Sequence, residues 1–457
     1  MRIETDPAAM QAVLSLYPAA GAAAFTDDEV LAALTLARIV RGVDAEAVAG
    51  AIRDVEAAGH PVERRVVAVG RPPEPGRDAW LEFAALERLP GRDGLPEDPA
   101  AATESRIVNV PAGETIALYH PLSDGMPGVN VRGEYVPVAA AIDATPRAGR
   151  NVRREGERLV ALADGRLIVD KRQMHVDENL TIDGDLTVLR GDIDFIGTLH
   201  IRGNVESGLS LRVAKDVLVS GSIFGSDVAC GGSLRVKRGI VGGGETRIDV
   251  GGNLEADFVE NVELTVRGQC QIHKSLVNAR VLCGQAFVMP GYGHLVSGQI
   301  YARDGIRAAQ VGVAHGATVK LVVGIDAIAA QRVVEIDREA DGLEERLRKV
   351  QSLLDELGPR SEAYATLSEQ RRREIDRLAE AQPQLEELRQ TLHDERTRVV
   401  QQMKKNHEAV ISVRGLVHED TVLQFPYDRL VLREPAKRVT YAFDMNDMRI
   451  VTRSLAA

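Results

Sequence analysis

Five short copies of one pattern decide the fold: Lys215-Asp216-Val217-Leu218-Val219, Gly232-Ser233-Leu234-Arg235-Val236, Gly252-Asn253-Leu254-Glu255-Ala256, Gly268-Gln269-Cys270-Gln271-Ile272 and Gly284-Gln285-Ala286-Phe287-Val288. Each copy is a pair of turn residues followed by a short segment with alternating apolar side chains. Weaker copies start at Asp185, Thr198 and Gly305, so the copies lie 13 to 20 residues apart. A repeat of this length, made of strands and glycine corners, is typical of a solenoid.

Apolar residues fall into four columns when the copies are aligned on their turn residues. Because alternate side chains of a strand share a face, columns two residues apart point the same way. We therefore predict a parallel β-helix with one apolar interior, and we expect Arg235 and Glu255, between columns, to point outward. The first column is Leu186, Leu199, Val217, Leu234, Leu254, Cys270, Ala286 and Ile306; the second is Val188, Ile201, Val219, Val236, Ala256, Ile272, Val288 and Ala308; the third is Phe195, Val213, Cys230, Val250, Val266, Leu282 and Ala302; the fourth is Val205, Ile223, Ile240, Val259 and Leu276.

The composition narrows the class of protein. A chain of 457 residues predicts two to four domains. The net charge of −11 argues against a nucleic-acid or anionic-membrane partner, because both need concentrated Lys and Arg. We find no signal sequence and no apolar run of about 18 residues, so no transmembrane segment is expected. Three cysteines argue against a disulfide scaffold and fit a reducing cytoplasm.

The sequence on either side of the repeat predicts further parts. We expect mostly helix in residues 1–60, with helices after Thr26 and from Asp44 to Ala58, followed by strands at 65–69 and 79–83. Residues 89–105, rich in Pro, Gly and Ala, read as a linker. The expected domains are 1–88 (α+β), 106–175 (small and β-rich), 176–326 (the β-helix), 327–407 (a helical hairpin) and 408–457 (a β segment that caps the β-helix).

Residues 327–407 have a heptad period. Gly358-Pro359 separates two apolar seams, which predicts an inserted antiparallel coiled-coil hairpin. Pro383 is expected to kink the second arm, which is predicted to be about 15 residues longer than the first. The first seam is Val333, Ile336, Ala340, Leu343, Leu347, Val350, Leu354 and Leu357, and the second is Leu367, Leu378, Leu385, Leu388, Leu392 and Val399.

Common enzyme motifs are missing from the sequence: there is no Gly-x-Ser-x-Gly, His-Glu-x-x-His, Cys-x-x-Cys or phosphate loop. Two sets of residues could still carry chemistry. Cys270, His273 and Cys283 have metal-ligand spacing, although Cys270 falls in an apolar column, where a free Cys is a small buried hydrophobe. The acids Asp183, Asp185, Asp192 and Asp194 could serve a lyase or hydrolase, although Asp is also a common turn residue. We assign no catalytic, cofactor-binding or metal residue.

Two Gly- and Pro-rich stretches carry a resemblance to a known family. They are Val67-Ala68-Val69-Gly70-Arg71-Pro72-Pro73-Glu74-Pro75-Gly76-Arg77-Asp78-Ala79-Trp80 and Gly125-Met126-Pro127-Gly128-Val129-Asn130-Val131-Arg132-Gly133. Together with Asp194-Phe195-Ile196-Gly197, Arg202-Gly203-Asn204-Val205-Glu206-Ser207-Gly208 and the order of the parts, they resemble the flagellar assembly protein A family, bacterial proteins with a β-helical core. His418-Glu419-Asp420 departs from a glycine-containing pattern of that family. The solenoid alone also resembles bactofilins and the β-helical half of septum-site inhibitors, which polymerise or bind partners.

The resemblance implies a cytoplasmic role in flagellar assembly or polar organisation, with no catalytic residue and no cofactor. We therefore favour a non-enzymatic scaffold that binds protein partners, not nucleic acid, as a capped monomer or small homo-oligomer. The alternative is an enzyme, lyase- or hydrolase-like and acting on polysaccharide, on the outer face of the β-helix. A trimeric acyltransferase β-helix is disfavoured, because it needs a strict six-residue repeat.

Overall fold

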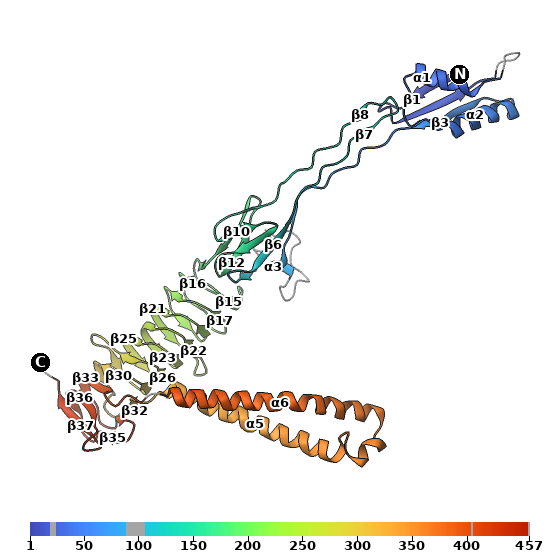
Figure 1. Ribbon diagram of the computed structural model, residues 1–457. Coiled ribbons are helices and arrows are strands. Elements are labelled where there is room, and N and C mark those ends of the chain that lie inside the picture. Colours follow the sequence, from blue (N-terminus) through green and yellow to red (C-terminus); the bar gives the residue numbers. More distant parts are fainter. Residues whose placement is uncertain (19–23, 88–105, 404, 456–457) are drawn as a thin grey trace. The chain divides into compact units, whose positions relative to one another are not determined.

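The computed structural model describes residues 1–18, 24–87, 106–403 and 405–455. The chain forms two compact units, Met1–Val176 and Asp177–Ala457, which are treated separately below (Figure 1). It is mainly β with helices, and a parallel β-solenoid of about eight turns occupies residues 179–323, as predicted. The linker expected at 89–105 lies outside the described residues.

The first unit begins with a three-stranded antiparallel sheet in the order β1-β2-β3 and two helices that pack on it. The predicted start signals are confirmed, because Thr26 forms a capping box with Glu29 and the Asp44 side chain caps the second helix, which ends at the left-handed Gly59. The elements are β1 (Arg2–Thr5), β2 (Gln11–Leu16), α1 (Asp27–Leu36), α2 (Ala45–Ala58) and β3 (Val62–Val69).

The prediction of mostly helix in residues 1–60 is wrong for the first third of that segment, which forms β1 and β2. Ala12, Leu14 and Leu16 are fully buried and are spaced two residues apart. This is the period of a strand, and it places all three against the helices. The run from Gln11 to Leu16 has only six residues, and in so short a run the sequence pattern does not distinguish a strand from a helix.

The two Gly- and Pro-rich stretches of the first unit pair with each other. Reciprocal backbone hydrogen bonds of 2.8 to 3.1 Å join Arg71 to Val129, Glu74 to Met126 and Arg77 to Ser123, one pair every third residue. The chains approach closely: a Cβ on Gly76 would lie 2.2 Å from the Ser123 carbonyl oxygen, and one on Gly125 would lie 2.5 Å from that of Glu74. Glycine is therefore required by close contact between the two extended chains.

The rest of the first unit is β-rich. Two four-stranded sheets, in the orders β10-β11-β6-β4 and β5-β12-β13-β9, share one apolar core, and β7 pairs with β8. The elements are β4 (Trp80–Glu82), α3 (Ala84–Glu87), β5 (Asn109–Val110), β6 (Thr115–His120), β7 (Gly128–Val129), β8 (Tyr135–Val136), β9 (Arg147–Ala148), β10 (Val152–Glu155), β11 (Arg158–Ala161), β12 (Gly165–Val169) and β13 (Gln173–Asp177).

The solenoid of the second unit consists of stacked parallel strands (Figure 1). One face is the sheet β14 (Asn179–Ile182), β16 (Thr198–Ile201), β18 (Val217–Val219), β21 (Leu234–Val241), β23 (Leu254–Glu260), β25 (Cys270–Val277), β27 (Ala286–Val288), β30 (Gly305–Ala308) and β33 (Val410–Val417), extended by β19 (Ile223–Phe224), β28 (His294–Leu295) and β31 (Gln310–Val311). The second face is β15 (Ile193–Phe195), β17 (Ser210–Val213), β20 (Asp227–Cys230), β22 (Arg247–Val250), β24 (Glu263–Val266), β26 (Ala279–Cys283), β29 (Gly298–Ala302), β32 (Val319–Val323), β34 (Val422–Gln424) and β35 (Arg429–Val431).

Most of the predicted columns are confirmed by the strand register. Leu199, Val217, Leu234, Leu254 and Cys270 are stacked partners on successive strands. All five residues of the fourth column are fully buried (Val205, Ile223, Ile240, Val259 and Leu276). The polar turn residue before each column also has a structural role, because its side chain accepts a backbone N–H of the next turn: Asp216 from Ser233 (2.6 Å), Ser233 from Asn253 (3.2 Å) and Asn253 from Gln269 (2.8 Å).

Three column assignments are wrong in the central turns. Phe287, not Ala286, stacks on Cys270, and Cys283, not Leu282, stacks on Val266. Val288 of the second column pairs with Gln271, an outward position, and Met289 is buried in its place. The cause is a bulge in β25, where Ser275 pairs with Phe258 although Ile272 pairs with Ala256. The bulge adds a residue to this turn and moves the residues after it by one position, which exchanges the inner and outer faces.

Two further assignments are wrong in the first turn. Leu186 stacks on Val205 and so belongs to the fourth column, while Leu180 takes its place beside Leu199. Val188 points outward and is 59% exposed. The weak copy at Asp185 therefore lies at a different corner of the turn from the other copies.

The helical hairpin is inserted between β32 and β33 (Figure 1, orange). It comprises α5 (Ala327–Leu357), the 3-10 helix η1 (Glu362–Thr366) and α6 (Glu369–Gln402). The arms contain 31 and 34 residues, so the prediction of a much longer second arm is wrong, because η1 and its flanking turns occupy the difference. Pro383 lies inside α6, and helix is assigned without a break across it.

The solenoid resumes after the hairpin. β33 pairs in parallel with β30, and β34 pairs in parallel with β32, which adds one more turn. The remaining strands are antiparallel: β35 pairs with β34, β36 (Ala436–Asp444) pairs with β33, and β37 (Arg449–Ser454) pairs with β36. These antiparallel strands cover the edge of β33, which would otherwise expose a row of unpaired backbone groups.

Candidate functional site at the hairpin root

The two arms of the hairpin hold each other through a narrow seam. Ile336, Leu343, Leu347 and Leu392 are buried there, and Ala340, Leu385 and Val399 pack against them. Ion pairs between the arms flank the seam, from Arg332 to Glu395 (2.9 Å) and from Arg396 to Asp337 (2.6 Å). Leu388 was assigned to the seam but is 49% exposed, whereas the buried residue Ile375 was missed.

Charged side chains cover the outer surface of the hairpin. Arg371 and Glu387 are exposed, and Glu344 pairs with Arg348 along the same helix at 3.8 Å. Exposed pairs of this kind contribute little to stability, since water screens them. These charges are therefore available to a partner at small cost to the fold.

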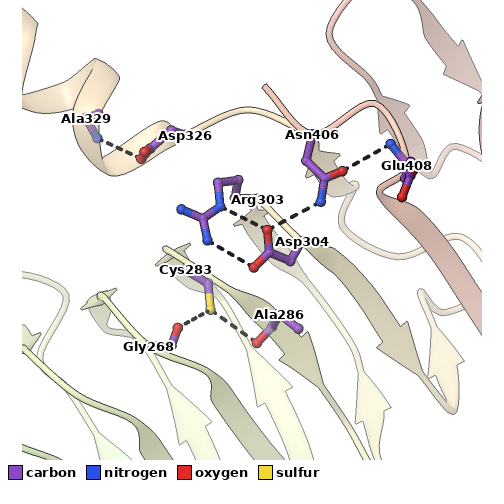
Figure 2. Close-up of polar contacts among 9 residues, drawn as sticks. All are labelled: Gly268, Cys283, Ala286, Arg303, Asp304, Asp326, Ala329, Asn406 and Glu408. Atoms are coloured by element: carbon purple, nitrogen blue, oxygen red, sulfur yellow. Dashed lines mark hydrogen bonds and ion pairs between the residues drawn. The ribbon is translucent and has the colours of Figure 1, made fainter. Parts of the chain in front are cut away.

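The root of the hairpin is a polar network that joins its two ends to the solenoid (Figure 2). The Asp304 carboxylate accepts hydrogen bonds from Arg303 Nε (2.9 Å) and Nη2 (3.1 Å) and from the Asn406 amide nitrogen (3.4 Å). The Asn406 amide oxygen accepts from the Glu408 backbone N–H at 3.1 Å, and Asp326 caps α5 by accepting from Ala329 N–H at 3.0 Å. One turn of the solenoid thus contacts the chain where it returns from the hairpin.

The two ends of the hairpin also contact each other. The backbone N–H of Asn406 donates to the Gly324 carbonyl at 3.0 Å, and the Gly324 N–H donates to the Arg303 carbonyl at 3.2 Å. Gly324 has a φ of +76°, and a Cβ there would lie 2.6 Å from the Asn406 carbonyl oxygen. A residue without a side chain is therefore needed where the chain leaves the solenoid.

Charge stabilises this root. The Arg303 guanidinium beside Asp304 lowers the pKa of that carboxyl below its ordinary value, and Asp304 in turn raises the pKa of Arg303. Nearby, the buried Cys283 thiol lies 3.2 Å from the Gly268 carbonyl oxygen and 3.3 Å from that of Ala286 (Figure 2). Burial raises its pKa to about 11, so Cys283 is a neutral thiol at physiological pH.

The first turns of α5 lie over the outer face of the second sheet. Leu282 and Val322 point outward from this sheet, yet only 4% and 3% of their surface is exposed. Both line a cleft together with Ala327, Ala330 and Val334 of α5. The helix therefore provides the cover that the solenoid lacks at these two positions.

Two clefts lie beside α5 at this point. In the larger, of about 920 Å³, Arg267 pairs with Asp249 (2.6 Å), and Arg332 pairs with Glu395 of α6 (2.9 Å). Glu263, Glu335 and Arg338 line both clefts. The smaller, of about 470 Å³, has Tyr301 in its wall. Both are bounded by solenoid on one side and by α5 on the other.

The structure places Cys270 and Cys283 near each other inside the solenoid but keeps His273 apart from them. His273 lies in the bulge of β25, and its ring nitrogen is 3.1 Å from the carboxylate of Glu255, an outward-facing side chain. The spacing of the three residues therefore does not bring them to one point. Among the residues that the structure describes, no group of three or more His, Cys, Asp or Glu is placed to hold a metal ion.

The four acids at the solenoid start have structural contacts. Asp185 and Asp192 accept backbone N–H groups of the next turn from Asn204 (2.6 Å) and Ser210 (2.8 Å), and Asp183 pairs with Arg202 at 2.7 Å. Asp194 lies on β15 and lines a different surface hollow. The turn role that Asp commonly has is thus confirmed for Asp185 and Asp192.

Sequence reasoning missed the root network and the clefts. Arg303-Asp304-Gly305 reads as an ordinary turn, and Asn406 lies about 100 residues away, so nothing local links them. One signal was available: Tyr301 and Val322 are large side chains at positions where other turns carry Asp249 or Thr265. An apolar change in an outward column indicates that something covers it.

Comparison with known proteins gives a match over nearly the whole chain. A family model described as the Flagellar Assembly Protein A beta solenoid domain matches residues 178–448, and one described as the Flagellar Assembly Protein A N-terminal region matches residues 1–172. No curated protein and no solved structure matches the chain. Within the described residues, no helix is both long enough and apolar enough to cross a bilayer.

Proposed function

Because the chain belongs to the flagellar assembly protein A family, we propose that it works in flagellar assembly as a scaffold whose helical hairpin binds a protein partner. The observation that carries this proposal is the self-contained hairpin, with its own seam and its own root. Membership of the family supports a role in flagellar assembly, and the hairpin supports a surface for binding a partner. The proposed location is the cytoplasm, with partners at the flagellar base or the cell pole.

The geometry of the hairpin supports a binding arm. Most of the apolar side chains that form its seam pack between the two helices, whereas charged side chains such as Arg371 and Glu387 are exposed to water. Charged surfaces of this kind speed association and select partners by complementarity. The root, fixed through Asp304 and Asn406, would hold such an arm on the solenoid.

A shortened chain tests the arm. Residues 330–405 are replaced by a short Gly/Ser linker, which is feasible because Gly324 and Asn406 are already hydrogen-bonded. We expect the β-sheet circular dichroism and most of the melting temperature to remain. In a flagellated host, the shortened chain should fail to restore swimming to a deletion strain and should lose partners in an affinity pull-down.

Point variants control for the deletion. Arg371→Gln with Glu387→Gln keeps the hairpin and changes its outer charge, so it should weaken partner capture, whereas Arg212→Gln on an exposed solenoid strand should not. Full swimming by the folded, shortened chain would place the binding surface elsewhere. An unfolded shortened chain would show that the hairpin is part of the solenoid core and would contradict the arm.

We also propose that the intact chain is a small, defined species and not a filament. β36 and β37 cover the β33 edge, and the outer strand β37 carries Arg449 and Arg453. Charges on an edge strand oppose pairing with another chain. Sedimentation of the intact chain should show one small species, and removing residues 436–455 should promote association. Filaments from the intact chain would contradict the proposal.

A further inference from the structure

The smaller cleft at the hairpin root carries cations on both of its walls. Three of its lining cations, Arg280, Lys320 and Arg338, have no ion-pair partner among the described residues. Arg280 and Lys320 come from neighbouring solenoid strands, and Arg338 comes from α5. The cleft therefore gathers unneutralised positive charge from both of its walls.

The acids in the lining do not cancel this charge. Glu335 is held by Arg332 at 3.4 Å, and Glu263 is held by Arg247 at 3.7 Å. Neither Arg332 nor Arg247 lines the smaller cleft. Each acid is thus paired with a cation outside the smaller cleft, and three lining cations against two lining acids leave a balance of +1 in a chain whose net charge is negative.

An aromatic ring lies among these cations. The Arg280 guanidinium carbon is 5.8 Å from the centre of the Tyr301 ring, and Lys320 Nζ is 5.5 Å from it. The Tyr301 hydroxyl donates to Gln299 at 3.0 Å, which fixes the outer end of the ring. Val334, which is 48% exposed, supplies apolar surface beside it.

We propose that this cleft binds a nucleoside phosphate. The base would lie against Tyr301 and Val334, and the phosphate would lie among Arg280, Lys320 and Arg338, since guanidinium and ammonium groups are the usual hydrogen-bond donors to phosphate. The volume of about 470 Å³ is in the range of sites for whole small molecules, and inorganic phosphate alone would fill little of it. Such a ligand joins α5 to the solenoid. The proposal does not depend on the identity of any flagellar partner.

Calorimetric titration of the full-length protein with AMP, GMP, CMP and UMP tests the site. At least one should bind with a Kd of about 1 mM or tighter. Arg338→Ala and Lys320→Ala should each weaken that binding about tenfold or more, because each removes a charge-assisted contact. Arg346→Ala is the matched control, since Arg346 is exposed on the same helix outside the cleft, and it should leave the affinity unchanged.

Tyr301→Leu separates the base from the phosphate. It should weaken nucleotide binding about tenfold while leaving the affinity for inorganic pyrophosphate unchanged. Melting temperatures of all variants, measured without ligand, verify folding. Absence of binding by all four nucleotides in the millimolar range would overturn the proposal, as would an affinity unaffected by Arg338→Ala. Pyrophosphate binding as tight as nucleotide binding would overturn the role of the ring.

Discussion

The solenoid and the hairpin reach stability in opposite ways. Every solenoid turn is held by the turns on either side, through backbone ladders and buried columns that join residues 16 to 20 positions apart. The hairpin closes on itself, with one seam and two ion pairs between its arms. The solenoid therefore responds as a stack to damage in one turn, whereas damage to the hairpin seam is expected to remain local.

Ile272→Asp should break the stack and give the largest effect. Ile272 is fully buried between neighbouring turns, so a carboxylate there has neither water nor a partner. We expect a loss of about 4 kcal/mol or more in the free energy of unfolding, measured by denaturant titration. Arg235→Gln is the control: its side chain is 66% exposed, and the change should be within about 0.5 kcal/mol. Equal losses would mean that the columns do not face inward.

Leu343→Ala tests whether hairpin damage stays local. Leu343 is 6% exposed in the seam, and truncation should cost the hairpin about 2–4 kcal/mol. Hydrogen exchange should show faster exchange in α5 and α6, with no change in β21, β23 and β25. Leu388→Ala, at a residue 49% exposed on the same hairpin, should change little. Faster exchange throughout the solenoid would show that the two regions unfold together.

A matched pair of glycines gives smaller effects of opposite sign. A Cβ on Gly251 would lie 2.1 Å from the Gly231 carbonyl oxygen of the adjacent turn, whereas a Cβ on Gly342 of α5 would meet nothing within 4 Å. Gly251→Ala should destabilise the protein by about 1–3 kcal/mol. Gly342→Ala should stabilise the hairpin by about 0.4–1 kcal/mol, since alanine favours helix. Thermal melts followed at the helical signal compare the two, and the same sign for both would contradict the contrast.

The smallest effect is expected at the hairpin root, where Asp304 joins the solenoid to the hairpin. There the melting temperature should depend on pH. The pKa of Asp304 in the folded protein is below its ordinary value of 3.8, so its stabilising contribution is complete above that value and is lost as the pH falls through the folded pKa. The side chain is 35% exposed, and water screens the pair. The native protein should melt at a higher temperature than the Asp304→Asn variant, and this difference should decrease as the pH falls below 3.8. A difference that grows on acidification would be incompatible with this sign.

The sequence predicted the solenoid well because its signals are repeated. Several aligned copies indicate the same inward-facing positions, so an unclear residue in one copy does not change the prediction. The errors occur where the repeat length changes, at the β25 bulge and at the first turn around Leu186. A bulge depends on the fit between neighbouring strands, and no local composition marks it.

The candidate site was harder to predict, because it is made by distant residues. Arg303 and Asn406 are brought together only by the return of the chain from the hairpin. The pairing of the two Gly- and Pro-rich stretches was missed for the same reason: Gly76 and Gly125 each suggest a tight local path, whereas the close contact is between them. A glycine in the sequence indicates that another group approaches the backbone closely, but it does not indicate which segment that group belongs to.

The insertion of the hairpin between two turns has a consequence for synthesis on the ribosome. Once β32 has emerged, the edges of β30 and β32 wait for β33 and β34, which follow only after roughly 90 further residues. At bacterial elongation rates this delay is about 4–18 s, during which the growing chain presents an open strand edge. Helical hairpins form in far less than a second, because their contacts are local. Association of α5 with α6 would thus bring β33 close to β30, the strand with which it pairs. A variant in which the two helices associate slowly should therefore show more aggregation of nascent chains, even when the stability of the folded protein is unchanged.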